Sequence, residues 1–253
     1  MKTRKSLLIG TLFVAACGTS RAGAQPAPGK WADTLSREID NAQRSGDLAK
    51  MQAARALAER VATAYPEDGL ILHYEGYALL REAQMTSTKS VDATPLLRRS
   101  NDAFARSAAL RPLAETYALI SSVDGQLIDA DPSRAMELGM ASQAAMSRAL
   151  ALGPKNPRVW LTRGQSAFFT PPEYGGGVKP AQEYLERAAE LFASDAPKPG
   201  EPSWGRAETQ IWLGQVYDKE GDAAKAARAY KAAVDLAPDY AWARALVDAA
   251  RKP

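Results

Sequence analysis

The stretch that decides the fold runs from Ala207 to Tyr240 and reads AETQIWLGQVYDKEGDAAKAARAYKAAVDLAPDY. Helix-forming residues fill two segments, which Gly221 and Asp222 separate. A glycine can take the left-handed conformation that ends a helix, and an aspartate can cap the next one. Pro238 then stops the second segment. The stretch therefore predicts two antiparallel helices joined by a short turn.

Small residues mark the place where these two helices would cross. Gly214 and Ala226 would let the helix axes approach to about 8–10 Å, with Tyr217 and Tyr230 filling the space beside them. The pattern of residues 207–240 resembles the tetratricopeptide repeat, a helix–turn–helix unit of about 34 residues. That resemblance implies stacked hairpins with a groove for a protein or peptide partner.

Prolines that follow helical segments recur along the chain. Pro66, Pro112, Pro154, Pro197 and Pro238 lie 46, 42, 43 and 41 residues apart. This spacing exceeds the roughly 34 residues of the standard repeat, so we expect inserts in the earlier hairpins. The expected inserts are residues 86–94, 129–133 and 170–179.

Apolar residues at helical spacing predict eleven helices and no strands. The predicted helices are residues 31–44, 47–65, 69–85, 95–110, 113–128, 133–152, 157–169, 180–194, 205–220, 222–236 and 239–251. We therefore expect an all-α solenoid of about five antiparallel hairpins, with the last helix as a C-terminal cap. The repeat domain would cover residues 31–253, and residues 25–30 would form a disordered leader. The proline-rich residues 196–203 are interpreted as a loop within this domain.

The amino terminus has the layout of a secretory signal peptide. Basic residues precede an apolar run over residues 7–17, and Ala22-Gly23-Ala24 offers a cleavage site. We expect a signal peptide over residues 1–24 and export to the periplasm or cell envelope. The apolar run is shorter than the roughly 20 residues that span a bilayer, so no retained membrane helix is expected.

Cys17 offers a second way to process the same segment. The sequence from Val14 to Gly18 resembles the lipobox of bacterial lipoproteins, in which the cysteine becomes the lipidated first residue. The signal would then cover residues 1–16, and the lipid would tether the protein to a membrane, with an outer-membrane lipoprotein as one form. Cys17 is the only cysteine, so a disulfide within one chain is excluded.

Charge argues against a nucleic-acid partner. The full chain carries 32 basic and 29 acidic residues, and four of the basic residues lie in residues 1–24. The processed chain would thus be close to neutral, without a basic stripe interleaved with aromatic residues. Binding to nucleic acid needs several clustered phosphate contacts, so we expect none.

The sequence offers no familiar catalytic or metal site. His73 is the only histidine, and the sequence around Ser166 lacks the second glycine of a nucleophile elbow. The glycines at 175–177 follow a predicted helix and lack the ending of a phosphate loop. The segment PPEYGGGVKPAQEYLERA instead resembles an insert of exported bacterial tetratricopeptide proteins. We expect a non-enzyme without cofactor or metal.

The resemblance to tetratricopeptide arrays implies a partner groove along the first helix of each hairpin. The predicted groove residues are His73, Tyr77, Arg81, Tyr117, Arg158, Leu161, Gln165, Phe168, Glu208, Gln215, Asp218 and Lys219, with Ser121, Asp124, Phe169 and Ile211 as neighbours. Phe168 and Phe169 would point about 100° apart, so at least one should be core. The mixture of charges and aromatic rings favours a polypeptide partner, which predicts a binding scaffold or adaptor.

Two alternatives belong to other classes of protein. A small-ligand or lipid-binding accessory protein of an envelope transport system would have a continuous cavity lined by Tyr77, Tyr117, Phe168 and Phe169. An envelope enzyme on a helical scaffold would need carboxylates that converge in a cleft. The dispersed acidic residues do not indicate such a cleft.

Overall fold

A computed structural model describes residues 28–86 and 92–250 of the chain. These residues form eleven α-helices and two short 3-10 helices, and no strand is present among them. The α-helices are α1 (Pro28–Ser45), α2 (Leu48–Ala64), α3 (Gly69–Thr86), α4 (Thr94–Leu110), α5 (Ala114–Ala130), α6 (Ala135–Leu152), α7 (Pro157–Phe169), α8 (Val178–Phe192), α9 (Arg206–Glu220), α10 (Ala223–Leu236) and α11 (Ala241–Ala250). The 3-10 helices are η1 (Pro132–Arg134) and η2 (Pro172–Tyr174).

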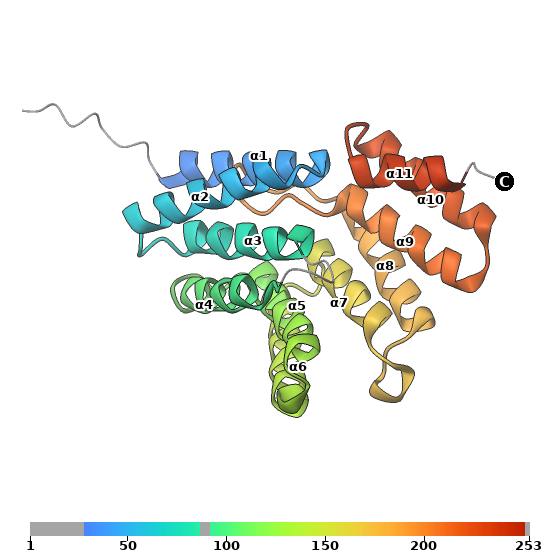
Figure 1. Ribbon diagram of the computed structural model, residues 1–253, viewed down its shortest axis with the longest axis horizontal. Helices are drawn as coiled ribbons and strands as arrows, with labels where there is room; N and C mark the ends of the chain where they lie inside the picture. The colour runs from blue at the N-terminus through green and yellow to red at the C-terminus, as the bar shows by residue number, and fades with distance from the viewer. Residues whose placement is uncertain (1–27, 87–91, 251–253) are drawn as a thin grey trace, which may run out of the picture.

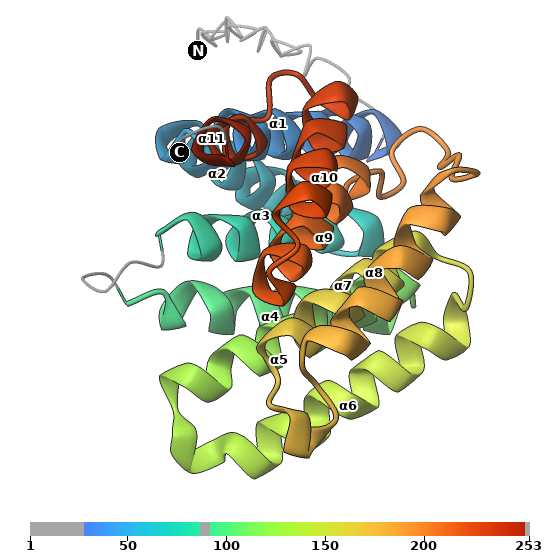
Figure 2. The same ribbon diagram turned by 90° about the vertical axis from the view of Figure 1, so that its right-hand side faces the viewer.

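The helices pair in sequence order, as Figures 1 and 2 show. The main antiparallel pairs are α3 with α4, α5 with α6, α7 with α8 and α9 with α10, while α1 packs on α2 and α11 covers α10. The predicted all-α solenoid of five hairpins and a capping helix is therefore confirmed. The predicted signal peptide and Cys17 lie outside the described residues.

One predicted boundary differs in a way that has a physical reason. The sequence predicts a disordered leader over residues 25–30, but residues 28–30 form the first turn of α1. Pro28 stands at the start of that helix, where a proline loses no helical hydrogen bond because the first N–H groups have no partner within the helix. The leader prediction is wrong for these three residues.

Glycines set the approach of the two helices in three hairpins. A Cβ atom added at Gly214 would lie 2.2 Å from the Tyr230 ring of α10. A Cβ atom added at Gly76 would lie 2.7 Å from the Phe104 ring of α4, and one added at Gly164 would lie 2.6 Å from Leu185 of α8. Each glycine thus accepts a bulky residue of the second helix, which confirms Gly214 as a crossing point.

The predicted turn between α9 and α10 is also confirmed. Gly221 has φ 79° and ends α9, and the N–H of Asp222 donates to the carbonyl oxygen of Tyr217 at 2.9 Å. The Asp222 carboxylate then accepts from the N–H of Lys225 at 2.9 Å and caps α10. Both ends of the turn are satisfied, so the hairpin angle is fixed locally.

The row of hairpins curls until its two ends touch. Helix α1 contacts α11, and Arg44 at the end of α1 pairs with Asp239 just before α11 at 3.2 Å. The side chain of Gln43 reaches the hydroxyl of Tyr240 at 3.5 Å. The solenoid is therefore closed on itself at this edge.

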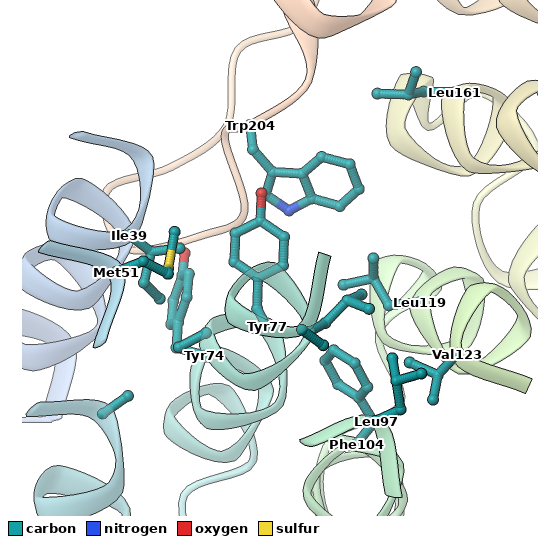
Figure 3. Packing of buried hydrophobic residues seen from close by; sticks show 14 of the residues in the cluster. Ile39, Met51, Tyr74, Tyr77, Leu97, Phe104, Leu119, Val123, Leu161 and Trp204 are labelled. Carbon is teal, nitrogen blue, oxygen red and sulfur yellow. The ribbon is translucent and has the colours of Figure 1, made fainter. Parts of the chain in front are cut away.

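Residues 193–205, which join α8 to α9, cross the inside of this curl; we call them the inner segment. Figure 1 shows the connection passing beneath α1 on its way to α9. Its Trp204 is buried, and its ring stacks on Tyr77 of α3 with centroids 5.3 Å apart. Figure 3 shows Trp204 above Tyr77, within a core that runs from α1 to α10. The inner segment is thus part of the packed domain.

The glycine insert between α7 and α8 is a tight connection. Gly175 and Gly177 have φ 82° and 102°, a region that favours glycine, and the N–H of Gly177 donates to the carbonyl oxygen of Ala167 at 2.8 Å. A Cβ at Gly176 would meet the carbonyl oxygen of Thr170 at 2.1 Å, whereas one at Gly175 meets nothing within 4 Å.

We expect Gly175→Ala and Gly176→Ala to destabilise the protein by different amounts. The first variant only forces a positive φ on alanine, which costs about 1 kcal/mol. The second drives a methyl group into backbone, so a loss of about 3 kcal/mol is expected. Urea denaturation followed by circular dichroism measures both. Equal losses would show that the connection relaxes around Gly176.

Candidate functional site

Three predicted groove residues from three helices meet in a buried polar cluster. Arg81 of α3 donates to both carboxylate oxygens of Glu208 on α9, at 3.1 and 2.6 Å, and Gln165 of α7 donates to the same carboxylate at 3.0 Å. Burial alone would lower the pKa of Arg81, but the Glu208 charge outweighs it and holds that pKa well above its ordinary value. The cluster fastens α3, α7 and α9 together.

His73 and Tyr77 of α3 lie beneath the surface. The His73 ring is fully buried, its Nδ1 lies 2.9 Å from the Thr116 hydroxyl, and it stacks on Tyr77. Burial lowers the pKa of His73 to about 3, so the imidazole is neutral at physiological pH. Tyr77 is covered by Trp204. With the inner segment in place neither side chain lines an open groove, which corrects the predicted groove at His73 and Tyr77.

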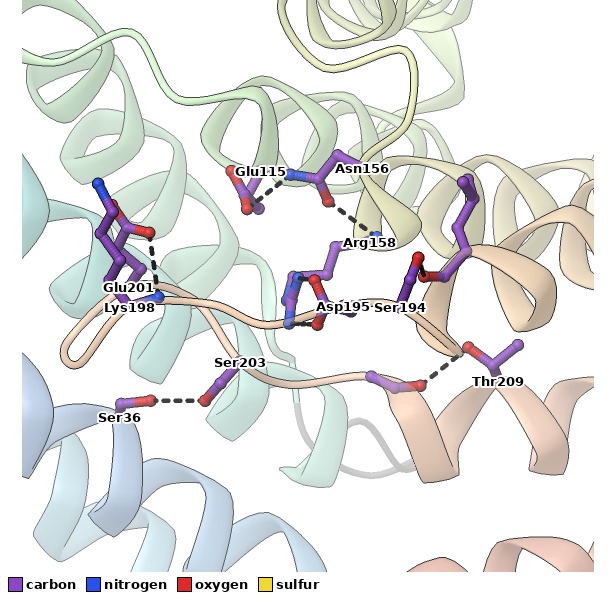
Figure 4. Close-up of polar contacts among 12 residues, drawn as sticks. Ser36, Glu115, Asn156, Arg158, Ser194, Asp195, Lys198, Glu201, Ser203 and Thr209 are labelled. Carbon is purple, nitrogen blue, oxygen red and sulfur yellow. Dashed lines mark hydrogen bonds and ion pairs between the residues drawn. The ribbon is translucent and has the colours of Figure 1, made fainter.

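Arg158 and Leu161 of α7 are covered by the same inner segment. Arg158 is 2% exposed and donates to both carboxylate oxygens of Asp195, at 3.1 and 2.6 Å, as Figure 4 shows. Leu161 is buried where α7 approaches Gly205. These residues do face inward, but the chain itself occupies the space in front of them.

The register predicted for α5 is wrong. Tyr117 packs against the Arg148 guanidinium of α6 at 5.9 Å, and Ser121 lies 2.9 Å from the Ser142 hydroxyl of the same helix. Asp124 accepts from Asn101 of α4 at 2.8 Å, and burial raises its pKa. All three therefore face neighbouring helices. A Cβ at Gly125, the glycine of α5, would meet nothing within 4 Å, so no crossing glycine marks the register of this helix.

In α9 the predicted groove residues divide between two faces. Gln215 donates to the Tyr230 hydroxyl at 2.9 Å, and that hydroxyl donates to Asp218 at 2.5 Å. Burial and Asp218 together raise the pKa of Tyr230. Gln215 and Asp218 therefore bind α10 through Tyr230, and Ile211 is buried. Lys219 instead points toward α7, with its Nζ 4.0 Å from the centroid of the Phe168 ring.

Four aromatic rings lie side by side on α7, α9 and α11. Helices α7 and α9 are the first helices of their hairpins, and α11 is the capping helix. We call Phe168, Phe169, Trp212 and Trp242 the aromatic stripe. Trp212 stands 5.5 Å from Phe168, 5.6 Å from Phe169 and 5.6 Å from Trp242, between ring centroids. Phe168 is 8% exposed, whereas Phe169 is 71% exposed and both tryptophans are half-buried. The stripe is an ordered aromatic surface that water still reaches.

Sequence reasoning found Phe168 and Phe169 but missed the two tryptophans. Trp212 lies one helical turn after Glu208, on the inward face of α9, and this spacing was a usable signal. Trp242 lies in the helix that the sequence assigned only to capping. Its contact with Trp212 depends on how α11 packs on the α9–α10 hairpin, which the residue pattern of either helix alone does not reveal.

One pocket lies apart from the four aromatic residues that the sequence predicts to line a lipid cavity. That pocket holds about 310 Å³ and lies where the starts of α5 and α7 face the inner segment. Its lining includes Glu115, Asn156, Arg158 and Asp195, and none of Tyr77, Tyr117, Phe168 and Phe169. These four do not share one environment, since Tyr77 is buried and Phe169 is exposed.

No helix among the described residues combines the length and apolar character needed to cross a bilayer. Within the same residues, no three His, Cys, Asp or Glu side chains are grouped so that they could hold a metal ion.

Comparisons with known proteins identify the fold. No protein-family model matches the chain, and no curated protein matches its sequence. Among solved structures, the HusA haemophore from Porphyromonas gingivalis aligns with a TM-score of 0.62 and 20% identity, over 78% of this chain and 96% of HusA. TTC0263, a thermophilic TPR protein of Thermus thermophilus, aligns with a TM-score of 0.62 and 18% identity, over 88% of this chain and 98% of that protein.

Proposed function

We propose that this chain, whose fold is that of a tetratricopeptide-like solenoid, is a non-catalytic scaffold that binds a protein or peptide through the aromatic stripe. The observation that carries the proposal is Phe169, which keeps 71% of its surface exposed although it contacts Trp212 and Phe168. Phe169 adjoins the half-buried Trp212, so its exposed ring belongs to an aromatic patch and is not a single scattered residue. Contiguous exposed apolar patches mark interaction sites.

The chemistry of the stripe suits a polypeptide partner. Tryptophan and other aromatic side chains are enriched at the centre of protein interfaces, where they bury much area for few rotatable bonds. The four rings already pack against one another, so little further side-chain entropy would be lost when a partner binds. Lys219, held over Phe168, adds a positive charge at the edge of the stripe. These features support a partner that brings apolar side chains and an acidic group.

Photo-crosslinking tests the placement of this surface. Benzoylphenylalanine at Phe169 is expected to capture a partner in cells, because Phe169 is the exposed ring of the stripe. Tyr174 in the glycine insert is the matched control, since it is aromatic and 79% exposed, and Met136 on α6 is a second control at 82% exposed. Adducts that form equally from Tyr174, or only from it, would move the binding surface to the insert.

A periplasmic or envelope location is the second element of the proposal. It is supported by the basic residues, the apolar run and the Ala22-Gly23-Ala24 site at the amino terminus. Such a protein would help to assemble or tether an exported complex. A lipid on Cys17 would make it a membrane-tethered scaffold, and cleavage after Ala24 would release it into the periplasm.

Mass spectrometry of the purified protein distinguishes these forms. We expect the processed chain outside the cytoplasm, beginning at Gln25 or at an acylated Cys17. The Cys17→Ser variant is the control: it should abolish the lipidated form and leave cleavage after Ala24 intact. A chain that keeps Met1 and stays in the cytoplasm would contradict the proposed export.

The similarity to a haemophore does not supply a histidine ligand for haem. His73 is the only histidine of the chain, and it is buried with Nδ1 beside Thr116. The surface of the described residues therefore offers no histidine to a haem iron. We therefore keep a protein or peptide as the proposed partner class.

A further inference from the structure

The inner segment occupies the place where an extended peptide would lie in a curved helical array. It touches the first helices of successive hairpins, with Ser203 near Ser36 of α1 and Trp204 on Tyr77 of α3. Asp195 binds Arg158 of α7. Figure 4 shows the segment running out between these helices and returning to α9. One stretch of chain thus covers much of the inner surface.

The contacts of the inner segment are those of a bound peptide. The hydroxyl of Tyr74 donates to the carbonyl oxygen of Gly200 at 2.9 Å. Two acidic side chains face arginines, since Asp195 meets Arg158 and Glu201 lies 3.4 Å from Arg111. Trp204 is the single large apolar anchor, between the Tyr77 ring and the Arg81 guanidinium. Pro197, Pro199 and Pro202 keep the segment out of a helix.

The fit between the inner segment and the helices is incomplete. The pocket of about 310 Å³ opens between them, lined on one side by residues of the segment and on the other by Glu115, Asn156 and Arg158. Arg158 is one of these lining residues, and its Nε atom is buried and has no hydrogen-bond partner among the described residues. Residues 196–199 are exposed to solvent. A permanent core element would be expected to fill this space and satisfy the donor.

Two glycines with positive φ lie in the inner segment, one at its outer turn and one where it joins α9. Gly200 has φ 80° at its outer turn and Gly205 has φ 107° at its junction with α9. Such positions can absorb large backbone changes without a side-chain penalty. Gly205 therefore provides a point at which the segment can bend where it joins α9.

We infer that the inner segment is an internal ligand of this surface. An extended, proline-rich, acidic segment of a partner, with one aromatic anchor, replaces it and binds Tyr77, Arg111 and Arg158. This inference goes beyond the proposed function, because it concerns the surface of α1, α3, α5 and α7 and not the aromatic stripe. Crosslinking from Phe169 can succeed or fail independently of it.

The first test supplies the segment as a separate molecule. The probe is a fluorescein-labelled peptide of residues 193–205, and binding is measured by anisotropy. A tethered ligand acts at an effective concentration in the millimolar range, so the intact protein should bind the peptide weakly. Trp204→Ala weakens the internal competitor, and the peptide should bind this variant at least tenfold more tightly. A control peptide with alanine in place of Trp204 should lose this gain.

Two outcomes of that test would overturn the inference. One is a Trp204→Ala protein with a native circular dichroism spectrum that does not bind the peptide. The other is equal binding of the peptide and its alanine control.

A second measurement does not depend on the stability of the Trp204 variant. With Cys17 replaced by serine, single cysteines are placed at Pro202 in the buried part of the segment and at Ala118 in the core of α5. If the segment leaves its site locally, thiol reagent labels the Pro202→Cys protein at least tenfold faster than Ala118→Cys, with little dependence on urea. Equal rates with the same urea dependence would show that residue 202 is exposed only by global unfolding, which would refute the inference.

Discussion

Glu208→Ala is expected to lower the free energy of unfolding by about 3–5 kcal/mol, because it leaves the buried Arg81 guanidinium without its partner. Arg81 and Glu208 expose only 6% and 7% of their side chains, and two charge-assisted hydrogen bonds join them. A guanidinium does not escape the penalty by losing its proton, since its pKa is too high. Urea denaturation followed by tryptophan fluorescence measures the loss.

Two controls distinguish the cost of an unpaired buried arginine from the loss of an ion pair. Glu137→Ala removes the carboxylate of an exposed pair with Arg134 and should leave the urea midpoint unchanged. The double variant Arg81→Met with Glu208→Leu removes both charges, so most of the stability lost by Glu208→Ala should return. A double variant as unstable as the single one would show that the charges themselves, and not the orphaned arginine, stabilise the contact of α3 with α9.

The contact between Arg81 and Glu208 also explains why several predicted groove residues are buried and do not line an open groove. The sequence assigned Arg81, Gln165 and Glu208 to the inner faces of three first helices, and the structure brings all three together. Local residue patterns do not predict the degree of curl, which brings together residues as distant in sequence as Arg44 and Asp239. A more open array would have left these polar side chains in solvent.

Crossing glycines explain in which hairpins the inward face of the first helix could be predicted from the sequence. Gly76, Gly164 and Gly214 each face a bulky residue of the second helix, and the inner face follows from that crossing point by helical periodicity. No such glycine marks α5, and the predicted register failed there. The sequence predicts a loop over residues 196–203, but local patterns do not predict the path of the inner segment. Tyr74 and Gly200, which it brings into contact, are 126 residues apart.

The largest packing effect is expected at Gly214. Its added Cβ would lie 2.2 Å from Cε1 of Tyr230, and the ring cannot swing away freely because Gln215 and Asp218 both bind its hydroxyl. Gly214→Ala should therefore cost about 3 kcal/mol, and Gly214→Leu should unfold the α9–α10 hairpin. Gly139→Ala on α6 is the matched control, because nothing lies within 4 Å of its Cβ position. That variant should gain about 1 kcal/mol from helix propensity.

A double-mutant cycle with Tyr230 identifies the cause of the loss. Tyr230→Ala alone removes a large buried ring and should cost about 3–5 kcal/mol, but it also creates the space that a methyl group at position 214 requires. In that background Gly214→Ala should cost little or become favourable, because only the helix-propensity gain remains. Thermal unfolding followed by circular dichroism provides all four values. If Gly214→Ala costs the same free energy with and without the tyrosine ring, this contact does not set the crossing of α9 and α10. The inward face of α9, to which Glu208 and Trp212 are assigned, could then not be derived from Gly214.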